Sequence, residues 1–207
     1  MGLPGYPGWD GRTGAGAVDP DGPAAVVAAF APAVIGTDRL VLDPLRPADA
    51  DAMVDLLGDE RLHGYTGGRP ADRAQLRRRY QRLAEGSGDP DEIWLNWIVR
   101  EAAGRAPVGT VQATVVRVGG TASAEVAWVV GVPWQGRGYA GEAARALVHW
   151  LYRQGAARIT ANIHPDHHAS ARVAQRAGMA VTDRQVDGER VWSTVPGPAG
   201  DPGTPRA

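Results

Sequence analysis

A glycine-rich turn at residues 135–140, with the sequence QGRGYA, is the stretch of this chain best suited to hold a ligand. An apolar run at 126–132 precedes it, and from Ala140 to Leu151 apolar residues recur with the period of a helix that Gly155 is expected to end. A strand that enters a helix through such a turn presents free backbone N–H groups at the positive end of the helix dipole. The sequence therefore predicts an anion site, most naturally for a phosphate group.

One interpretation of the turn is a dinucleotide site. Gly136, Gly138 and Gly141 form the pattern G-x-G-x-x-G, which holds a diphosphate when it follows a strand and opens a helix. A doubly wound nucleotide-binding fold carries this pattern in an early βαβ unit, with several strands after it. Here the turn lies about two thirds of the way along the 207 residues, so a nucleotide-dependent oxidoreductase is the weaker alternative.

A second motif follows the turn. The strand expected at 158–164 is stopped by Pro165, and the segment 167–179 then has the pattern of a helix that ends at Gly178. This segment is similar to the second motif of the GCN5-related N-acetyltransferases, N-x-x-S/A-x-x-V/L-A/Y-x-x-x-G-F/M. His167 occupies the position of the asparagine.

The turn itself fits the first motif of the same family. Gln135, Gly138 and Ala140 match Q/R-x-x-G-x-G/A, in which the turn holds the diphosphate of acetyl-CoA. Two motifs in the family's order are far more specific than either alone. The chain therefore resembles the GCN5-related N-acetyltransferases (GNAT) from about Thr37 to Val195, and most closely the branch that includes ribosomal-protein N-terminal acetyltransferases.

The resemblance implies a fold class and a domain organisation. An α+β domain with the GNAT fold is expected at 37–195, with a mixed, mostly antiparallel twisted sheet of about six to seven strands and helices on both faces. A central pair of parallel strands should splay apart to form the CoA cleft, with Gly131 and Pro133 interrupting their ladder. Residues 1–36 are expected to form a mostly disordered extension and 196–207 a disordered tail, since both are rich in glycine and proline.

The resemblance also implies a set of coenzyme contacts. Backbone groups near Val130 and Val132 should pair with the pantetheine amides as an added strand would. The amides of the turn should take the diphosphate, while Arg137 either adds charge there or is a solvent-facing turn residue. The residues expected to contact acetyl-CoA are Val130, Val132, Gln135, Gly136, Arg137, Gly138, Tyr139, Ala140, His167 and Ser170.

Two residues are candidates for proton transfer. Glu125 matches the carboxylate that, in many relatives, draws a proton from the amine through water, although a carboxylate at a strand edge can also be simply solvated or paired. The backbone N–H near Val130 is the expected oxyanion donor. Ala174 stands where many relatives have a tyrosine, so Ser170 becomes the candidate acid for the departing thiolate; the alternative is a first-turn serine that caps the helix.

Composition excludes several classes of function. A formal net charge of −1 and 43% hydrophobic residues give no sign of binding to nucleic acid or to a membrane surface through bulk charge. The absence of cysteine excludes disulfides, thiolate metal sites and a cysteine nucleophile. There is no long apolar run and no pattern of a signal peptide, so a cytoplasmic enzyme is expected. His164, His167 and His168 match no common zinc spacing, so no metal is expected.

Together these features predict an acetyl-CoA-dependent N-acetyltransferase that modifies a primary amine and acts as a monomer or homodimer. The acceptor is either a protein N-terminus or a small-molecule amine. An α-amino group, with a pKa near 7.7–8.0 against about 10.4 for lysine, is the easier of the two to deprotonate. A non-catalytic acyl-CoA sensor is the alternative, because Ala174 and His167 depart from the common pattern.

Overall fold

The computed structural model describes residues 30–65, 69–118 and 121–194. The expected extension up to residue 29 and the expected tail at 196–207 lie outside these ranges. Phe30 is buried in the core and Ile35 belongs to a strand, so residues ahead of Thr37 pack with the domain. None of the helices in the described ranges is both long enough and apolar enough to cross a membrane.

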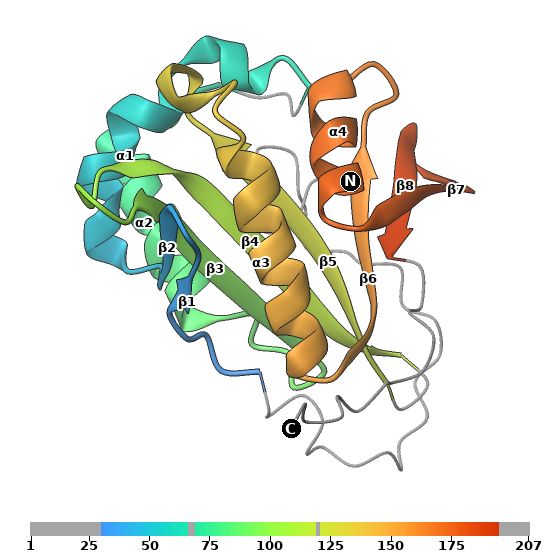
Figure 1. The fold of residues 1–207 in the computed structure, drawn as a ribbon. Helices are drawn as coiled ribbons and strands as arrows, with labels where there is room; N and C mark the ends of the chain where they lie inside the picture. The colour runs from blue at the N-terminus through green and yellow to red at the C-terminus, as the bar shows by residue number, and fades with distance from the viewer. Residues whose placement is uncertain (1–29, 66–68, 119–120, 195–207) are drawn as a thin grey trace, which may run out of the picture.

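The described strands form one sheet in the order β1-β2-β3-β4-β5-β6-β8-β7 (Figure 1). All neighbours are antiparallel except β5 and β6. The strands are Ile35–Gly36 (β1), Leu40–Pro44 (β2), Glu92–Glu101 (β3), Pro107–Val118 (β4), Thr121–Val130 (β5), Ala156–Ile163 (β6), Met179–Val186 (β7) and Glu189–Thr194 (β8). The expected fold class is confirmed, with the two-residue β1 raising the described count to eight. A doubly wound fold would need a parallel sheet, so the dinucleotide interpretation is wrong.

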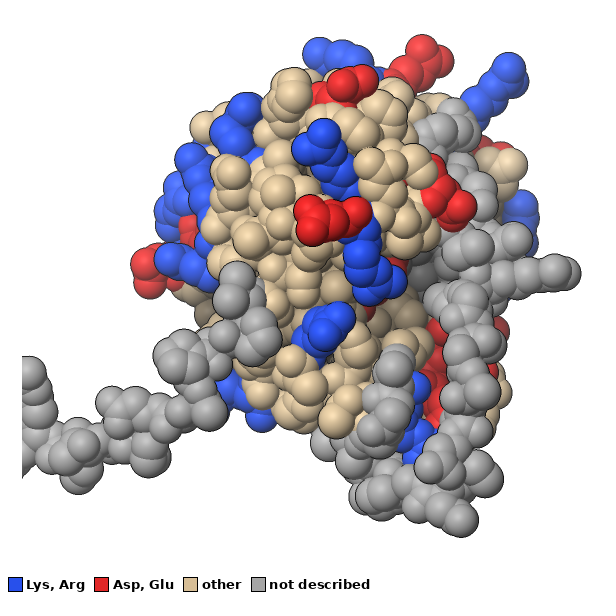
Figure 2. All heavy atoms as spheres, turned by 90° about the vertical axis from the view of Figure 1, so that its right-hand side faces the viewer, with Lys and Arg blue, Asp and Glu red and all other residues tan. Residues whose placement is uncertain are grey.

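Helices cover both faces of the sheet. In the described ranges they are Ala50–Leu57 (α1), Arg73–Glu85 (α2), Tyr139–Arg153 (α3) and His168–Arg176 (α4), with short 3₁₀ turns at Pro47–Asp49 (η1), Glu60–His63 (η2) and Val132–Trp134 (η3). Figure 1 shows α3 and α4 on one face and α1 and α2 on the other. On the side formed by α4, β7 and β8, basic and acidic side chains are interspersed rather than separated by sign (Figure 2).

Strand alternation divides the buried residues between two clusters. Leu95, Trp97 and Val99 of β3 face the larger core under α3, where Leu147 and Leu151 are at most 1% exposed. Ile98 points to the opposite face and packs in the cluster of α1 and α2. The helical period predicted for α3 is thus confirmed, and Gly155, with φ +98°, follows its last turn as expected.

The parallel pair β5–β6 is joined over only part of its length. Its register runs from Ala122 opposite Ala156 to Glu125 opposite Thr160 and then stops. Beyond those residues, 126–130 and 161–163 have no ladder between them, and Figure 1 shows the strands diverging toward the start of α3 and α4. We call this divergence the splay. The splay was predicted, but its assignment to Gly131 and Pro133 is wrong, because pairing ends well before either residue.

Gly131 has a packing role instead. Its φ of −56° suits any residue, but a Cβ at this position would lie 2.5 Å from Leu56 Cγ of α1. We therefore expect Gly131→Ala to lower the free energy of unfolding by about 1–3 kcal/mol through overpacking, measured by urea denaturation. In the double variant with Leu56→Ala the two losses should be less than additive, because the clash is gone. Fully additive losses would show that Leu56 is not the obstacle.

Candidate active site

The start of α3 has the geometry of an anion site. Gly136 and Gly138 adopt left-handed conformations, with φ of +77° and +82°, and Gly138 is the N-cap of the helix. The first hydrogen bond inside α3 runs from Glu142 N–H to the Gly138 carbonyl, at 3.1 Å. The N–H groups of residues 139–141 precede that bond and have no partner within the helix. They lie where the helix dipole is positive, as the sequence predicted.

Two arginines from other elements flank this turn. Arg39 Nη2 and Arg176 Nη1 lie 3.6 Å and 3.8 Å from the position that a Cβ on Gly138 would take. Arg39 Nη1 also donates to the Arg137 carbonyl, at 3.1 Å, which ties the turn to the start of β2. The Arg137 guanidinium lies over the Trp134 ring, 4.8 Å from its centroid. The site therefore has one cation from the residue before β2 and one from α4, and local sequence motifs predicted neither.

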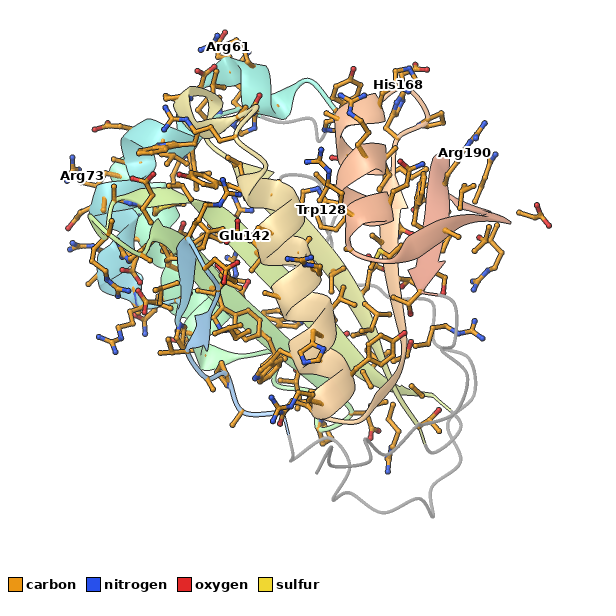
Figure 3. The ribbon with its side chains drawn as sticks, viewed as in Figure 1. Arg61, Arg73, Trp128, Glu142, His168 and Arg190 are labelled. Atoms are coloured by element: carbon orange, nitrogen blue, oxygen red, sulfur yellow. The ribbon has the colours of Figure 1, made fainter. Side chains whose placement is uncertain are left out.

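Glu142, which Figure 3 labels on α3, fixes Arg39 in this position through an ion pair. Its carboxylate accepts hydrogen bonds from Thr37 Oγ1 at 2.6 Å, from the Arg39 backbone N–H at 3.1 Å and from Arg39 Nε at 2.7 Å. Burial opposes ionisation of Glu142, but the bonds from Thr37 and Arg39 outweigh it and lower the pKa of the carboxyl. The turn between β1 and β2 is thereby attached to the first turn of α3.

The edge of β5 at the splay carries backbone groups without a strand partner. Gly131 N–H donates to the Val108 carbonyl of β4, at 2.9 Å. Because N–H groups alternate in direction along a strand, those of Val126, Trp128 and Val130 are directed away from β4, toward the splay. These groups form an edge to which an extended ligand can add, and Val130 is the residue that was predicted to do so.

Two motif residues use their side chains inside the protein. Gln135 Nε2 donates to the Val130 carbonyl at 3.0 Å, and the Gln135 backbone N–H donates to Val132 at 3.2 Å. Both carbonyls expected to face pantetheine therefore have a partner in this structure. The Tyr139 side chain is buried and its hydroxyl donates to Glu101 Oε1 at 2.6 Å, a bond that raises the pKa of the phenol. The phenol also interacts with Arg137 of the turn, which acts on its pKa in the opposite direction.

Glu125 lies at the closed end of the splay, in the last pair of the parallel ladder, opposite Thr160. Burial, followed by the neighbouring Glu189 carboxylate on β8, raises the pKa of Glu125 to about 7, although a hydrogen bond with Asn162 acts in the other direction. Burial also raises the pKa of Glu189, against the effect of nearby His164. A carboxyl that titrates near neutrality, beside an opening in the sheet, is suited to general base catalysis.

A family model described as "Acetyltransferase (GNAT) domain" matches residues 39–180, which is more than half of the chain. The chain belongs to the GNAT acetyltransferase family. This match includes the turn at the start of α3, Glu125 and the whole of α4. A search of the curated proteins finds no match.

Solved structures agree with this GNAT assignment. An acetyltransferase from Agrobacterium tumefaciens is 25% identical with a TM-score of 0.61, and the match covers 80% of this chain and 96% of that one. RimL, a ribosomal-protein alpha-N-acetyltransferase solved with coenzyme A, is 15% identical with a TM-score of 0.64 over 78% and 96% of the two chains. The aminoglycoside acetyltransferase AAC(6')-Ib, solved with acetyl-CoA, is 18% identical with a TM-score of 0.61 over 75% and 92%.

The second motif forms α4 of the GNAT domain. His167 is the N-cap of α4, and its side chain makes no capping hydrogen bond. Ser170 is the third residue of the helix and is partly exposed. Its hydroxyl forms no hydrogen bond with any other residue that the structure describes, so the interpretation of Ser170 as a helix cap is wrong. The role of Ser170 as proton donor stays a prediction.

Tyr65, which no motif singled out, extends from the segment after η2 to the start of α4. Its ring stacks on His167, with centroids 4.2 Å apart and an interplanar angle of 16°, and lies 5.5 Å from the His164 ring. The Tyr65 hydroxyl donates to the Asp166 carbonyl at 3.4 Å. Burial, with a smaller effect of His164, lowers the pKa of His167.

Within the described ranges no group of three His, Asp or Glu residues could hold a metal ion.

Proposed function

We propose that this GNAT domain is an N-acetyltransferase that moves the acetyl group of acetyl-CoA to a primary amine by direct attack on the thioester. The observation that carries this proposal is the partly buried Glu125, with a pKa of about 7, at the closed end of the splay. Coenzyme held at the start of α3 and along the free edge of β5 would extend toward this carboxyl.

The reaction follows from the residues around the splay. The Glu125 carboxylate takes a proton from the acceptor ammonium, through a water molecule, and the neutral amine attacks the thioester carbon. The Val130 N–H donates to the developing oxyanion. As the carbon–sulfur bond breaks, the Ser170 hydroxyl gives its proton to the thiolate and regains one from the acylated nitrogen. Alignment of the two substrates can supply roughly 7–11 kcal/mol of the rate enhancement.

Release of free coenzyme A tests the proposal directly. Because the chain contains no cysteine, a thiol reagent added to the purified protein detects only the thiol of CoA. We expect thiol release from acetyl-CoA that depends on an added primary amine, with mass spectrometry showing the acetylated amine. Tight binding of acetyl-CoA without turnover over a broad panel of peptides and small amines would instead favour the acyl-CoA sensor.

Arg176 is proposed as a coenzyme ligand in addition to the motif residues. Its side chain crosses Gly141 of α3, where a Cβ would lie 3.0 Å from Arg176 Cδ, and it ends beside Gly138. We expect Arg176→Gln to weaken CoA binding about threefold to tenfold in calorimetry, since a charge-assisted bond to phosphate is lost. Arg172→Gln, an exposed arginine on the same helix, is the matched control and should bind normally. Equal effects of both substitutions would indicate only a general charge effect.

A further inference from the structure

A pocket lies between the sheet and the layer formed by α1, η2 and α2, on the face opposite α3. Leucines supply most of its helical wall, and the sheet supplies a mixed floor. The residues that define it best are Leu57, Leu62, Leu76, Leu83, Gln112 and Val129. No aspartate or glutamate is among the described residues that line it, and its one arginine is Arg79. The pocket thus has apolar walls and no negative charge.

His63 supplies an unused hydrogen-bond acceptor in this pocket. Its Nε2 lies 3.2 Å from the Leu57 carbonyl, and since a carbonyl only accepts, Nε2 must carry the proton. Nδ1 is then an acceptor. It is buried and has no hydrogen-bond partner among the residues that the structure describes. A buried acceptor without a partner costs free energy, so a ligand with a suitably placed donor would be favoured here.

The pocket shares a face of β5 with Glu125. Val129 lines the pocket, and Glu125 lies four residues earlier, so both side chains point to the same side of the strand, about 13 Å apart along it. None of the described residues that line the pocket is acidic, whereas Glu125 has the Glu189 carboxylate as its neighbour. A ligand whose cationic amine is at Glu125 can therefore place an uncharged body toward the leucine wall.

We propose that this pocket holds the body of the acceptor, which is a primary monoamine with a short aromatic or aliphatic body that ends in a hydroxyl or N–H donor for His63 Nδ1. This inference rests on the proposed acetyl transfer and specifies its substrate class. Amines with a second positive charge bind poorly, because the second ammonium would be desolvated beside Arg79 with no carboxylate to pair with it.

Matched amines test the assignment through thiol release. Tyramine and 2-phenylethylamine differ only in the terminal hydroxyl, and pentylamine and 1,5-diaminopentane differ only in the second amine. We expect kcat/KM to be about tenfold higher for tyramine than for 2-phenylethylamine, as one added hydrogen bond allows. We expect it to be at least tenfold lower for the diamine than for pentylamine. Equal values within either pair would overturn the proposal.

Two substitutions localise the effect. His63→Phe should lower the ratio of kcat/KM for tyramine to kcat/KM for 2-phenylethylamine from about tenfold to about one, because phenylalanine lacks the Nδ1 acceptor as well as the Nε2 that contacts the Leu57 carbonyl. A tyramine preference that survives in this variant would overturn the role of His63. Leu83→Trp, which narrows the pocket from α2, should raise KM for tyramine at least fivefold with KM for acetyl-CoA unchanged. Ala84→Trp, on the exposed side of α2, is its matched control.

The possible failures are distinguishable. No thiol release with the four amines, when other members of the broad panel are acetylated, would overturn the pocket assignment. No release with the whole panel would overturn the proposed acetyl transfer, while calorimetric binding of tyramine would still test the pocket. If His63→Phe fails to fold, as its melting curve would show, Leu83→Trp decides the question. An unchanged KM for tyramine in a folded Leu83→Trp protein would show that acceptors bind elsewhere.

Discussion

Gly138→Val is expected to lower the affinity for CoA about a hundredfold while the protein remains folded. Gly138 has φ +82°, a conformation that β-branched residues rarely adopt, so the turn must rearrange to accept valine. The N–H groups of residues 139–141 would then lose their alignment on the diphosphate. Losing one or two charge-assisted hydrogen bonds, each worth about 1.5–3 kcal/mol, gives an effect of this size. Isothermal titration calorimetry with CoA measures it.

Gly155→Val is the matched control for this substitution. Gly155 also has a left-handed φ, of +98°, but it follows the opposite end of α3 and has no atom within 4 Å of its Cβ position. Both variants should lose about 1–3 kcal/mol of stability from backbone strain. Only Gly138→Val should lose CoA affinity. Unchanged affinity in Gly138→Val, or an equal loss in both variants, would contradict the assignment of the turn to the diphosphate.

Glu125→Gln should lower kcat/KM for amine acetylation on the order of 10²–10⁴-fold, the usual contribution of a general base. In the unsubstituted protein kcat/KM should rise with pH through about 7, because only the carboxylate accepts a proton and the pKa of Glu125 is raised to that value. The rise should be absent from the residual activity of Glu125→Gln. A rate that is unchanged at pH 8 would exclude Glu125 as the base.

Glu125→Gln should also raise the free energy of unfolding at pH 8. The sign of this effect follows from the linkage between proton binding and folding. The folded-state pKa of Glu125 is above its ordinary value of 4.5, so the protonated carboxyl favours the folded state at low pH and this contribution is lost as pH rises through about 7. Ionised Glu125 then costs up to about 3 kcal/mol, which neutral glutamine avoids. Melting temperatures of the two proteins should coincide at pH 4 and differ at pH 8. The exposed Glu60→Gln variant should show no such difference.

Local sequence patterns predicted the end of β5, the turn at 135–140 and α3, because these elements follow one another directly in the chain. The apolar run, the turn and the α3 stripe lie next to one another in sequence, and the left-handed Gly138 and Gly155 occur where the motif and the helix end require them. The two-residue β1 could not be predicted, since it exists only through its pairing with β2. The splay was implied by family resemblance, but its position depends on the register of β5 against β6, which no local pattern specifies.

Contacts between distant segments explain what was missed at the site. Arg39 bonds to Arg137 across 98 residues, and Tyr65 reaches Asp166 across 101, so neither forms a motif with its partner. The position of Glu125 was predicted from family resemblance, but its pKa depends on burial and on Glu189 from β8. Gln135 differs from these residues. The motif singled it out as a coenzyme contact, but its side chain donates to the Val130 carbonyl of the protein's own backbone.

The position of the two helical layers has a consequence for the release of the products. Between the layer of α3 and α4 and the layer of α1 and α2, the sheet ladder is interrupted at the splay (Figure 1). In the proposed reaction, coenzyme and acceptor approach this interruption from opposite faces. In that reaction each product would depart on its own side while the other site stayed occupied, and the catalytic cycle would need no separation of the layers.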